Sequence, residues 1–172
     1  MNRLTLALDV MGGDIGPRIT IPASLSALEA DPMLSLVLFG DSQQISSLLE
    51  NAPSSLLERI QIHHCTKTID NNQGISHALR HSKGTSMRLA IEMVQKGEAQ
   101  GCVSAGNTGA LMGLSKVLLQ PLDGIQRPAL VSLLPSMTGD KTVMLDLGAN
   151  VECSAKNLYE FAVMGSIFAE NR

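Results

Sequence analysis

The chain has 172 residues, of which 44% are apolar, and this is enough to bury a core of the size usual for one domain. Its 13 basic and 16 acidic residues are mixed along the sequence and give a formal net charge of −3, so no basic stripe marks a nucleic-acid partner. Three scattered cysteines disfavour a disulfide framework, and the apolar runs are too short to predict a membrane span or a signal-peptide core.

Short apolar runs alternate with amphipathic stretches along the whole chain. The apolar runs predict strands at Leu4–Val10, Leu34–Phe39, Ile60–His64, Gly101–Ser104, Ala129–Leu134 and Thr142–Leu147. Helical periodicity predicts helices at Ile21–Ala30, Gln43–Glu50, Ser86–Lys96, Thr108–Leu119 and Ser154–Ala169. Several strands are apolar at nearly every position, as is typical of a parallel sheet covered on both faces. The sequence therefore predicts a doubly wound α/β fold with right-handed crossovers.

Two stretches depart from this alternation. Residues Thr66–Lys83 are polar and irregular, and they predict a long surface loop or lid. Residues Pro121–Pro128 combine proline, aspartate and glycine and predict a break between a helix and a strand. Neither stretch has the composition of a linker, so the sequence predicts no division of the chain.

Three glycine-bearing turns follow three predicted strands. In an open α/β sheet such turns collect at the carboxyl ends of the strands, where ligands bind, so we expect the three to converge. The first turn follows Asp9 and contains Gly12, Gly13 and Asp14. Paired glycines let the backbone approach a ligand closely, although a tight turn with Asp14 as a helix cap would explain the same residues.

The second turn runs from Ser104 through Gly106, Asn107 and Thr108 to Gly109, at the start of a long predicted helix. Small residues there let several backbone N–H groups point at one anion, with the positive end of the helix dipole behind them. The side chains of Ser104, Asn107 and Thr108 add hydrogen-bond donors. This turn is our candidate site for phosphate.

The third turn, after Asp146, ends at Asn150, and Arg88 lies near the start of another predicted helix. Asp146 is placed to orient a ligand or a neighbouring loop, while Asn150 could equally be a helix cap. Arg88 could pair bidentately with a phosphate, whose charge it would offset, or with a carboxylate, or it could be a solvated surface arginine.

The patterns typical of cofactor and metal sites are missing from the sequence. A GxGxxG fingerprint would need glycine at positions where the chain has Asp14 and Pro17, and neither a GK[ST] P-loop nor a GxSxG motif occurs. His63 and His64 would point to opposite faces of a strand. His77 and His81 are spaced for one helix face but lack an evident third ligand. We therefore predict no cofactor and no metal.

Five strings of the sequence are distinctive in combination: LALDVMGGDIGP (6 to 17), GTSMRLAIEMV (84 to 94), CVSAGNTGALMGLSKVLL (102 to 119), IQRPAL (125 to 130) and TVMLDLGANVEC (142 to 153). In these strings, and in their order, the chain resembles the phosphate acyltransferase family of bacterial phospholipid synthesis. This resemblance implies a three-layer α/β/α, Rossmann-like, mostly parallel sheet related to phosphate acetyltransferase and isocitrate dehydrogenase. Family members are about twice as long, so residues 1–172 would be the N-terminal part of that α/β domain, without the C-terminal half.

The resemblance also implies transfer of a fatty acyl group from acyl carrier protein to inorganic phosphate. The implied enzyme is a cytoplasmic homodimer, loosely associated with the inner membrane face, whose acyl phosphate feeds a membrane glycerol-3-phosphate acyltransferase. On this reading Asn107, Asp146 and Asp9 are the candidate catalytic residues. The candidate phosphate and substrate contacts are Ser104, Gly106, Thr108, Gly109, Gly12, Gly13, Asp14, Arg88 and Asn150.

Two other classes of protein remain compatible with the sequence. One is a nucleotide-dependent dehydrogenase in which Asp41 would bind a ribose, although the broken glycine fingerprint counts against it. The other is a non-catalytic piece or dimerisation module. Binding of NAD would identify the first, and the native mass of the protein would bear on the second.

Overall fold

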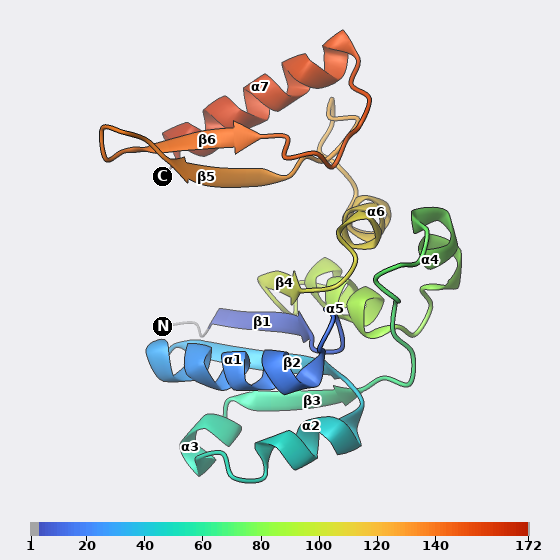
Figure 1. The fold of residues 1–172 in the computed structure, drawn as a ribbon, viewed down its shortest axis with the longest axis vertical. Helices are drawn as coiled ribbons and strands as arrows, with labels where there is room; N and C mark the ends of the chain where they lie inside the picture. The colour runs from blue at the N-terminus through green and yellow to red at the C-terminus, as the bar shows by residue number, and fades with distance from the viewer. Residues whose placement is uncertain (1–3, 172) are drawn as a thin grey trace. The chain divides into compact units, whose positions relative to one another are not determined.

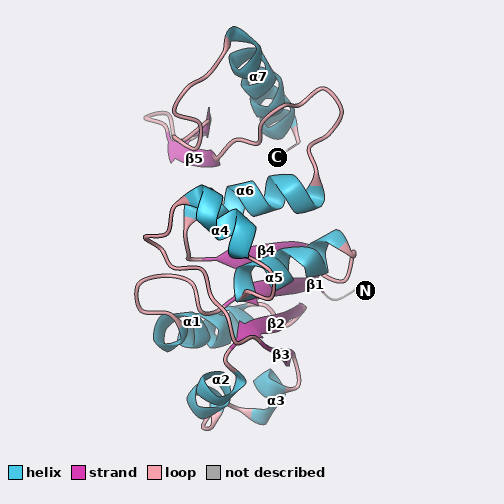
Figure 2. Cartoon of the chain, turned by 90° about the vertical axis from the view of Figure 1, so that its right-hand side faces the viewer, coloured by secondary structure: helices cyan, strands magenta, loops and turns pink. Residues whose placement is uncertain are grey.

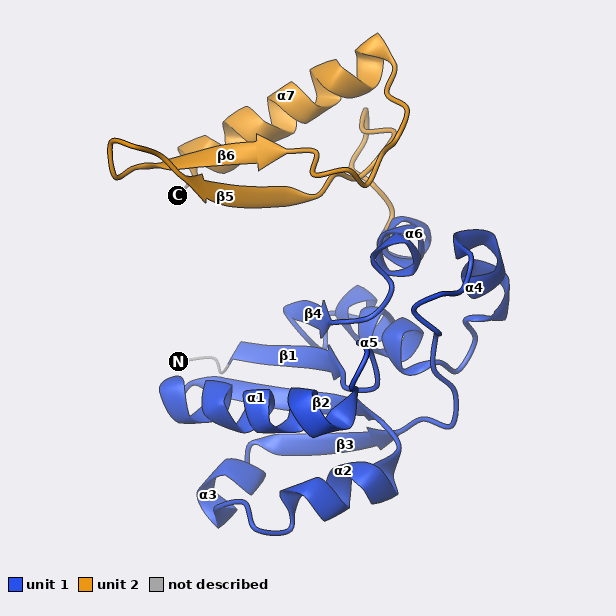
Figure 3. Ribbon diagram, in the orientation of Figure 1, with its two compact units in different colours: residues 1–119 blue, residues 120–172 orange. Residues whose placement is uncertain are grey.

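The computed structural model describes residues 4–171, which form two compact units. The first unit extends to Leu119 and the second begins at Gln120 (Figure 3). This boundary coincides with the start of the irregular stretch Pro121–Pro128. Each unit has its own sheet.

The first unit is an α/β fold built on a four-stranded parallel sheet (Figure 1). The strand order is β3-β2-β1-β4, so the chain crosses over between β3 and β4 to reach the other side of β1. This confirms the predicted fold class. Its elements in chain order are β1 (Leu4–Asp9), α1 (Pro17–Ala30), β2 (Leu34–Gly40), α2 (Ser42–Leu49), α3 (Ser54–Leu57), β3 (Ile60–His64), α4 (Ile75–His81), α5 (Ser86–Gln95), β4 (Gly101–Ser104) and α6 (Thr108–Leu119).

Helices lie on both sides of the sheet (Figure 2). Side-chain alternation along the strands divides the core of this unit between the two faces of the sheet. Leu6 and Leu8 of β1 join a cluster with Ile21 and Leu28 of α1. Ala7, between them in sequence, packs on the opposite face in a cluster with Ala90 of α5. The sheet therefore has a helix layer on each face, as parallel strands require.

Helix α1 begins at Pro17, four residues before the predicted start. Proline suits the first helical position because its fixed φ is helical and the N–H it lacks would have had no partner. The N-cap is Gly16 with φ 64°, a left-handed conformation that glycine adopts readily. The alternative that Asp14 caps this helix is therefore wrong.

The predicted loop at Thr66–Lys83 contains a helix, α4, so that prediction was wrong for Ile75–His81. The helix packs on α6 at two glycines. A Cβ at Gly109 would lie 2.5 Å from Cδ1 of Ile75, and one at Gly113 would lie 3.0 Å from Cδ2 of Leu79. Tertiary packing across α4 and α6 thus stabilises a helix that is too short to form on local propensity.

The second unit contains β5 (Val131–Pro135), β6 (Lys141–Leu145) and α7 (Ala155–Glu170). Both predicted strands exist, but they pair with each other antiparallel instead of extending a parallel sheet. The reason is the short connection Ser136–Asp140, which allows a hairpin but not a crossover helix. Helix α7 begins with a capping box between Ser154 and Asn157, so Asn150 is not its cap.

Candidate functional site

The first two glycine turns touch each other, as predicted, because they follow the neighbouring strands β1 and β4. A Cβ at Gly12 would lie 2.7 Å from the backbone nitrogen of Gly106, a distance that no side chain tolerates. Gly13 has φ 89°, and its Cβ would lie 3.3 Å from that of Ala105. Glycine is therefore required at both positions for the turns to pack backbone against backbone.

A buried carboxylate lies beneath this contact. Asp9 is only 4% exposed, and its Oδ2 accepts a hydrogen bond of 2.8 Å from the Ser104 hydroxyl. The Ser104 oxygen in turn accepts the N–H of Gly106 at 3.1 Å. Oδ1 of Asp9 has no hydrogen-bond partner within residues 4–171. Asp9 thus holds the second turn through Ser104, and it keeps one buried acceptor unpaired.

Two cysteine thiols near this carboxylate remain protonated at neutral pH. Burial, and then the charge of Asp9, raise the pKa of Cys65 to about 11 and that of Cys102 to about 12. Because the thiolate is the reactive form, neither sulfur is a nucleophile under ordinary conditions. The raised pKa values therefore argue against a cysteine nucleophile in the first unit.

Asn107 uses its whole side-chain amide within the protein. Its Oδ1 accepts the N–H of Ala110 at 2.9 Å, which caps α6. Its Nδ2 donates to the carbonyl oxygens of Asn71 at 2.8 Å and Gln73 at 3.2 Å. These contacts favour a structural role for Asn107, as a brace that joins α6 to the segment before α4, over a role as a direct hydrogen-bond donor to a ligand.

Backbone donors, in contrast, are open at the same place. The N–H groups of Asn107, Thr108 and Gly109 enter no hydrogen bond with any described residue. They belong to the N-cap and first turn of α6, where the helix dipole adds positive potential. The second turn therefore has the geometry that predicted an anion site, supplied by the backbone more than by side chains.

The polar segment before α4 lies against the first turn. The side-chain amide of Asn71 donates to Oδ1 of Asp14 at 3.1 Å. A polar cavity of about 320 Å³ lies here and is lined by Met11, Gly13, Asp14, Thr68, Ile69, Asp70, Asn71 and Asn72. Sequence reasoning missed Asn71 as a site residue, because its contact with Asn107 spans 36 positions and has no local signal.

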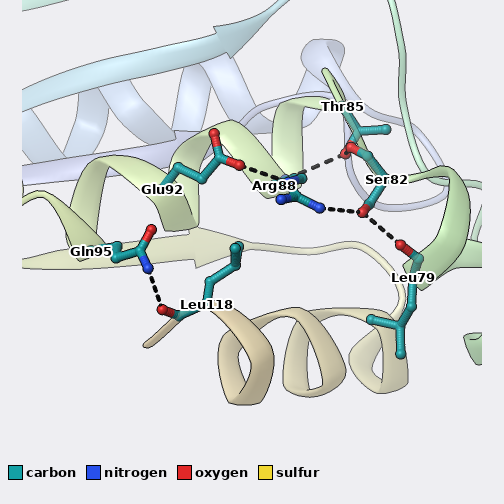
Figure 4. A network of polar contacts seen from close by, with 7 residues as sticks. All are labelled: Leu79, Ser82, Thr85, Arg88, Glu92, Gln95 and Leu118. Carbon is teal, nitrogen blue, oxygen red and sulfur yellow. Dashed lines mark hydrogen bonds and ion pairs between the residues drawn. The ribbon is translucent and has the colours of Figure 1, made fainter. Parts of the chain in front are cut away.

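Arg88 lies in a polar network between α4 and α5 (Figure 4). Its Nε contacts Oε1 of Glu92 at 2.6 Å, and its Nη1 donates to the Ser82 hydroxyl at 3.1 Å. The Ser82 hydroxyl donates to the carbonyl of Leu79 at 2.8 Å, at the end of α4. None of these contacts involves a residue of the glycine turns, so they favour a structural role for Arg88.

The third glycine turn belongs to the second unit. Asp146 accepts the N–H of Leu130 at 2.7 Å through Oδ1 and that of Asn150 at 2.8 Å through Oδ2. Asn150 also donates from its side chain to Oδ2 of Asp146 and to the carbonyl of Pro128. Burial raises the pKa of Asp146, but the hydrogen bonds from Leu130, Asn150 and Ala149 outweigh it and leave the pKa below its usual value.

This turn also borders a cavity within the second unit. The cavity has a volume of about 530 Å³ and is lined by Val143, Leu145, Asp146, Gly148, Asn150, Cys153, Leu158, Phe161, Ala162 and Gly165. Nearby in the same unit, Glu160 is only 3% exposed and accepts the N–H of Gln126 at 2.8 Å. Glu160 was not predicted, because a glutamate within an amphipathic helix carries no signal of burial.

The residues considered for a nucleotide or a metal have other partners. Asp41 accepts the N–H groups of Gln43 and Gln44 as the N-cap of α2. The hydrogen bond from Gln44 is the largest cause of the lowered pKa of Asp41, and the cap accounts for this residue without a ribose. His77 and His81 stack with ring centroids 4.1 Å apart. Within residues 4–171, no three His, Cys, Asp or Glu side chains are grouped to hold a metal.

No helix in the described range is both long and apolar enough to cross a membrane.

Comparison with known proteins places the whole sequence in one family. The chain is 77% identical over 172 residues to a phosphate acyltransferase of Mannheimia succiniciproducens, and 78% identical over 171 residues to one of Pasteurella multocida. A phosphate acyltransferase of Actinobacillus succinogenes is 72% identical over 176 residues. The alignments cover 99% to 100% of this chain but 50% to 52% of the relatives, so the chain spans about half their length. Residues 4–172 match the model of the family described as fatty acid synthesis protein, and the chain belongs to this family.

Proposed function

We propose that this chain is the phosphate-binding part of a phosphate acyltransferase. The reaction is transfer of a fatty acyl group from acyl carrier protein to inorganic phosphate, which gives an acyl phosphate for phosphatidic acid synthesis. The relatives of this chain are named for this activity. The observation that carries the assignment is the open set of backbone donors at Asn107, Thr108 and Gly109, next to two turns in backbone contact.

The reaction needs positioning more than covalent catalysis. A phosphate oxygen forms a bond to the thioester carbon, the carbon–sulfur bond breaks, and the sulfur takes up a proton. Phosphate is a competent nucleophile near neutral pH, and a thiol with a pKa of ~8.5 leaves readily as thiolate. The protonated state of Cys65 and Cys102 agrees with a direct transfer that forms no acyl-enzyme.

Every candidate residue except Asp14 and Arg88 has a place in this proposal. The N–H groups of the second turn bind phosphate, and Thr108, which is exposed, adds its hydroxyl. Asp9 fixes Ser104, and Asn107 fixes the helix start, so both act as positioning residues. Gly12, Gly13 and Gly106 keep side chains away from the anion. In the second unit, Asp146 and Asn150 order the loop that borders the larger cavity.

Partners and location follow from the family resemblance and belong to the same proposal. The working protein is a cytoplasmic homodimer, peripheral at the inner membrane face. Acyl carrier protein delivers the acyl group. A membrane glycerol-3-phosphate acyltransferase consumes the acyl phosphate. Size determination in solution and cell fractionation test the dimer and the location separately from the chemistry.

The test compares this chain with a protein as long as its relatives. Acyl phosphate formation is measured from acyl carrier protein thioester and labelled phosphate, and phosphate binding is measured by NMR at Gly106 to Gly109. We expect the 172-residue chain to bind phosphate at this turn but to turn over weakly or not at all. An acyl groove and a carrier surface must be held beside the anion, and half a family-length chain is too short for all three.

Equal rates from the two proteins would show that the complete site lies in the residues named here. Phosphate bound elsewhere, with Gly106 to Gly109 unchanged, would contradict the assignment of the phosphate site. If a protein as long as the relatives and containing this chain forms no acyl phosphate, this result would contradict the function itself.

A further inference from the structure

Two buried polar atoms of the first unit, one on Asp9 and one on Ser86, have no hydrogen-bond partner among residues 4–171. They are Oδ1 of Asp9, at the end of β1, and the hydroxyl oxygen of Ser86, at the start of α5. Asp9 is 4% exposed and Ser86 is 1% exposed. Buried polar atoms are nearly always paired with protein or with ordered water, so both atoms are expected to have a partner in solution.

Helix α5 runs antiparallel to the strands, with its start at the carboxyl edge of the sheet. The N–H of Ser86 donates to the carbonyl of Lys67 at 3.1 Å, and Lys67 follows the end of β3. Beyond the other end of the helix, the N–H of Gln100 donates to the carbonyl of Thr5, near the start of β1. Ser86 therefore lies at the level of the strand ends.

Helix and strand spacing place Ser86 over Asp9. Ala90 of α5 and Ala7 of β1 are both completely buried and pack in one cluster on this face of the sheet. Ser86 precedes Ala90 by four residues, which is about 6 Å along the same helix face. Asp9 follows Ala7 by two residues, which is about 6.6 Å along the same strand face. Both steps lead toward the carboxyl edge, so the two side chains face each other between β1 and α5.

The neighbours of Asp9 on this face of the sheet do not supply the missing hydrogen bond. In register with Asp9 are Phe39 on β2, which has no polar side-chain atom, and Ser104 on β4, whose hydroxyl already donates to Oδ2 at 2.8 Å. The thiol of Cys102 lies one level lower in the register, and a thiol is a weak donor. Ser86 has a strong donor at this level that no other described group uses.

We infer that Ser86 is a positioning residue of the proposed phosphate site and acts through Asp9. Because the two side chains are not hydrogen-bonded directly, one ordered water joins them: it donates to Oδ1 of Asp9 and accepts the O–H of Ser86. Oδ2 of the same carboxylate accepts the hydroxyl of Ser104, which in turn accepts the N–H of Gly106. Ser86 thereby acts on the turn that binds the anion. This inference deepens the proposed function and rests on it for the anion.

The link to Ser86 matters because the terminal torsion of an aspartate is broad, so that one hydrogen bond alone does not fix the carboxylate. A second hydrogen bond, on Oδ1, restricts this torsion and holds Oδ2 of Asp9 toward Ser104. The low dielectric around buried groups strengthens such a network. Loss of the Ser86 hydroxyl therefore loosens Ser104 and Gly106 without removing any group that contacts phosphate.

The test compares two serine-to-alanine variants of the 172-residue chain. Ser86→Ala removes the hydroxyl opposite Asp9. Ser24→Ala is the matched control, because Ser24 is also buried in a helix, at 3% exposed, but its hydroxyl donates to the carbonyl of Thr20 on the other side of the sheet. The amide signal of Gly106 is followed by NMR without phosphate, and the dissociation constant for phosphate is then measured by calorimetry.

We expect Ser86→Ala to change the amide shift of Gly106, to speed its hydrogen exchange about 10-fold, and to raise the dissociation constant for phosphate about 3- to 10-fold. Ser24→Ala should change none of these quantities. In a Ser104→Ala background the link between Asp9 and the turn is already cut, so Ser86→Ala should leave the dissociation constant unchanged there. Thermal melts establish that each variant is folded.

An unchanged Gly106 signal in folded Ser86→Ala would overturn the inference, as would an equal change in Ser24→Ala. An effect of Ser86→Ala on phosphate affinity that persists in the Ser104→Ala background would also refute it, because the effect would not pass through Asp9. If the unsubstituted chain binds no phosphate, the proposed phosphate site fails, and the Gly106 signal still decides whether Ser86 acts on the turn. If Ser86→Ala does not fold, a crystal structure of the unsubstituted chain decides, and the inference fails if neither a water nor a direct hydrogen bond joins Ser86 to Asp9.

Discussion

The backbone donors of the second glycine turn can be tested one at a time, and Thr108 is the most informative position. Proline has no N–H, and it is favoured at the first position of a helix, where Thr108 lies in α6. Thr108→Pro therefore removes a single donor without breaking the helix. Thr108→Ala is its matched control, because both variants lose the hydroxyl and only one loses the N–H.

The size of the effect follows from the bond that is lost. A hydrogen bond to a charged group contributes about 1.5 to 3 kcal/mol, so the dissociation constant for phosphate should be about 10- to 100-fold higher in Thr108→Pro than in Thr108→Ala. The side chain of Asn107 still caps the helix through Ala110 in both variants, so their melting temperatures should agree closely.

Calorimetric titration of the 172-residue chain with phosphate gives the two dissociation constants. Circular dichroism and thermal melts check that both variants keep the helix. Equal phosphate affinity in two folded variants would refute the reasoning, because the N–H of Thr108 would then make no contact with the anion.

Three further outcomes are expected. Asn107→Ala removes a helix cap and two donors to carbonyl oxygens and should lower stability by about 2 kcal/mol, measured by urea unfolding; an unchanged midpoint would show that the brace contributes nothing. Asp146 has a lowered pKa when folded, so its stabilising effect is present above its unfolded pKa of ~3.9 and is lost as pH falls through the folded value. The loss of unfolding free energy caused by Asp146→Asn, measured in urea, should therefore be larger at pH 6 than at pH 3. An equal loss at both pH values would contradict this. With their raised pKa values, Cys65 and Cys102 should resist alkylation at pH 8 while exposed Cys153 reacts, as peptide mass spectrometry would show, and equal labelling of all three would count against their burial.

The sequence predicted well those features that depend on local pattern. Strand β2 is apolar apart from Ser35 and lies in the sheet interior, as its composition indicates. Helix α6 begins and ends at the predicted residues. The contact between the first two glycine turns was also predictable, since turns after neighbouring parallel strands must meet at one edge of the sheet.

Features that depend on distant contacts were not predictable. Helix α4 owes its place to Gly109 and Gly113, which lie more than 30 positions away along the chain. The role of Asn107 is set by carbonyl groups of Asn71 and Gln73, and backbone oxygens carry no sequence signature. The antiparallel pairing of β5 and β6 depended on the length of one connection, which strand composition does not reveal.

The bonds of Asn107 have a consequence for the energetics of binding. One amide group joins the start of α6 to a segment 36 positions earlier, so the order of the two is thermodynamically coupled. Such coupling is reciprocal. An anion that orders the helix start also orders Asn71 and Gln73, and a change that disorders that segment lowers the affinity for the anion by the same factor. For the proposed phosphate site, affinity for the anion would thus measure how firmly residues 71 to 73 are held, and amide exchange rates around Gly74 should respond to phosphate that does not contact Gly74.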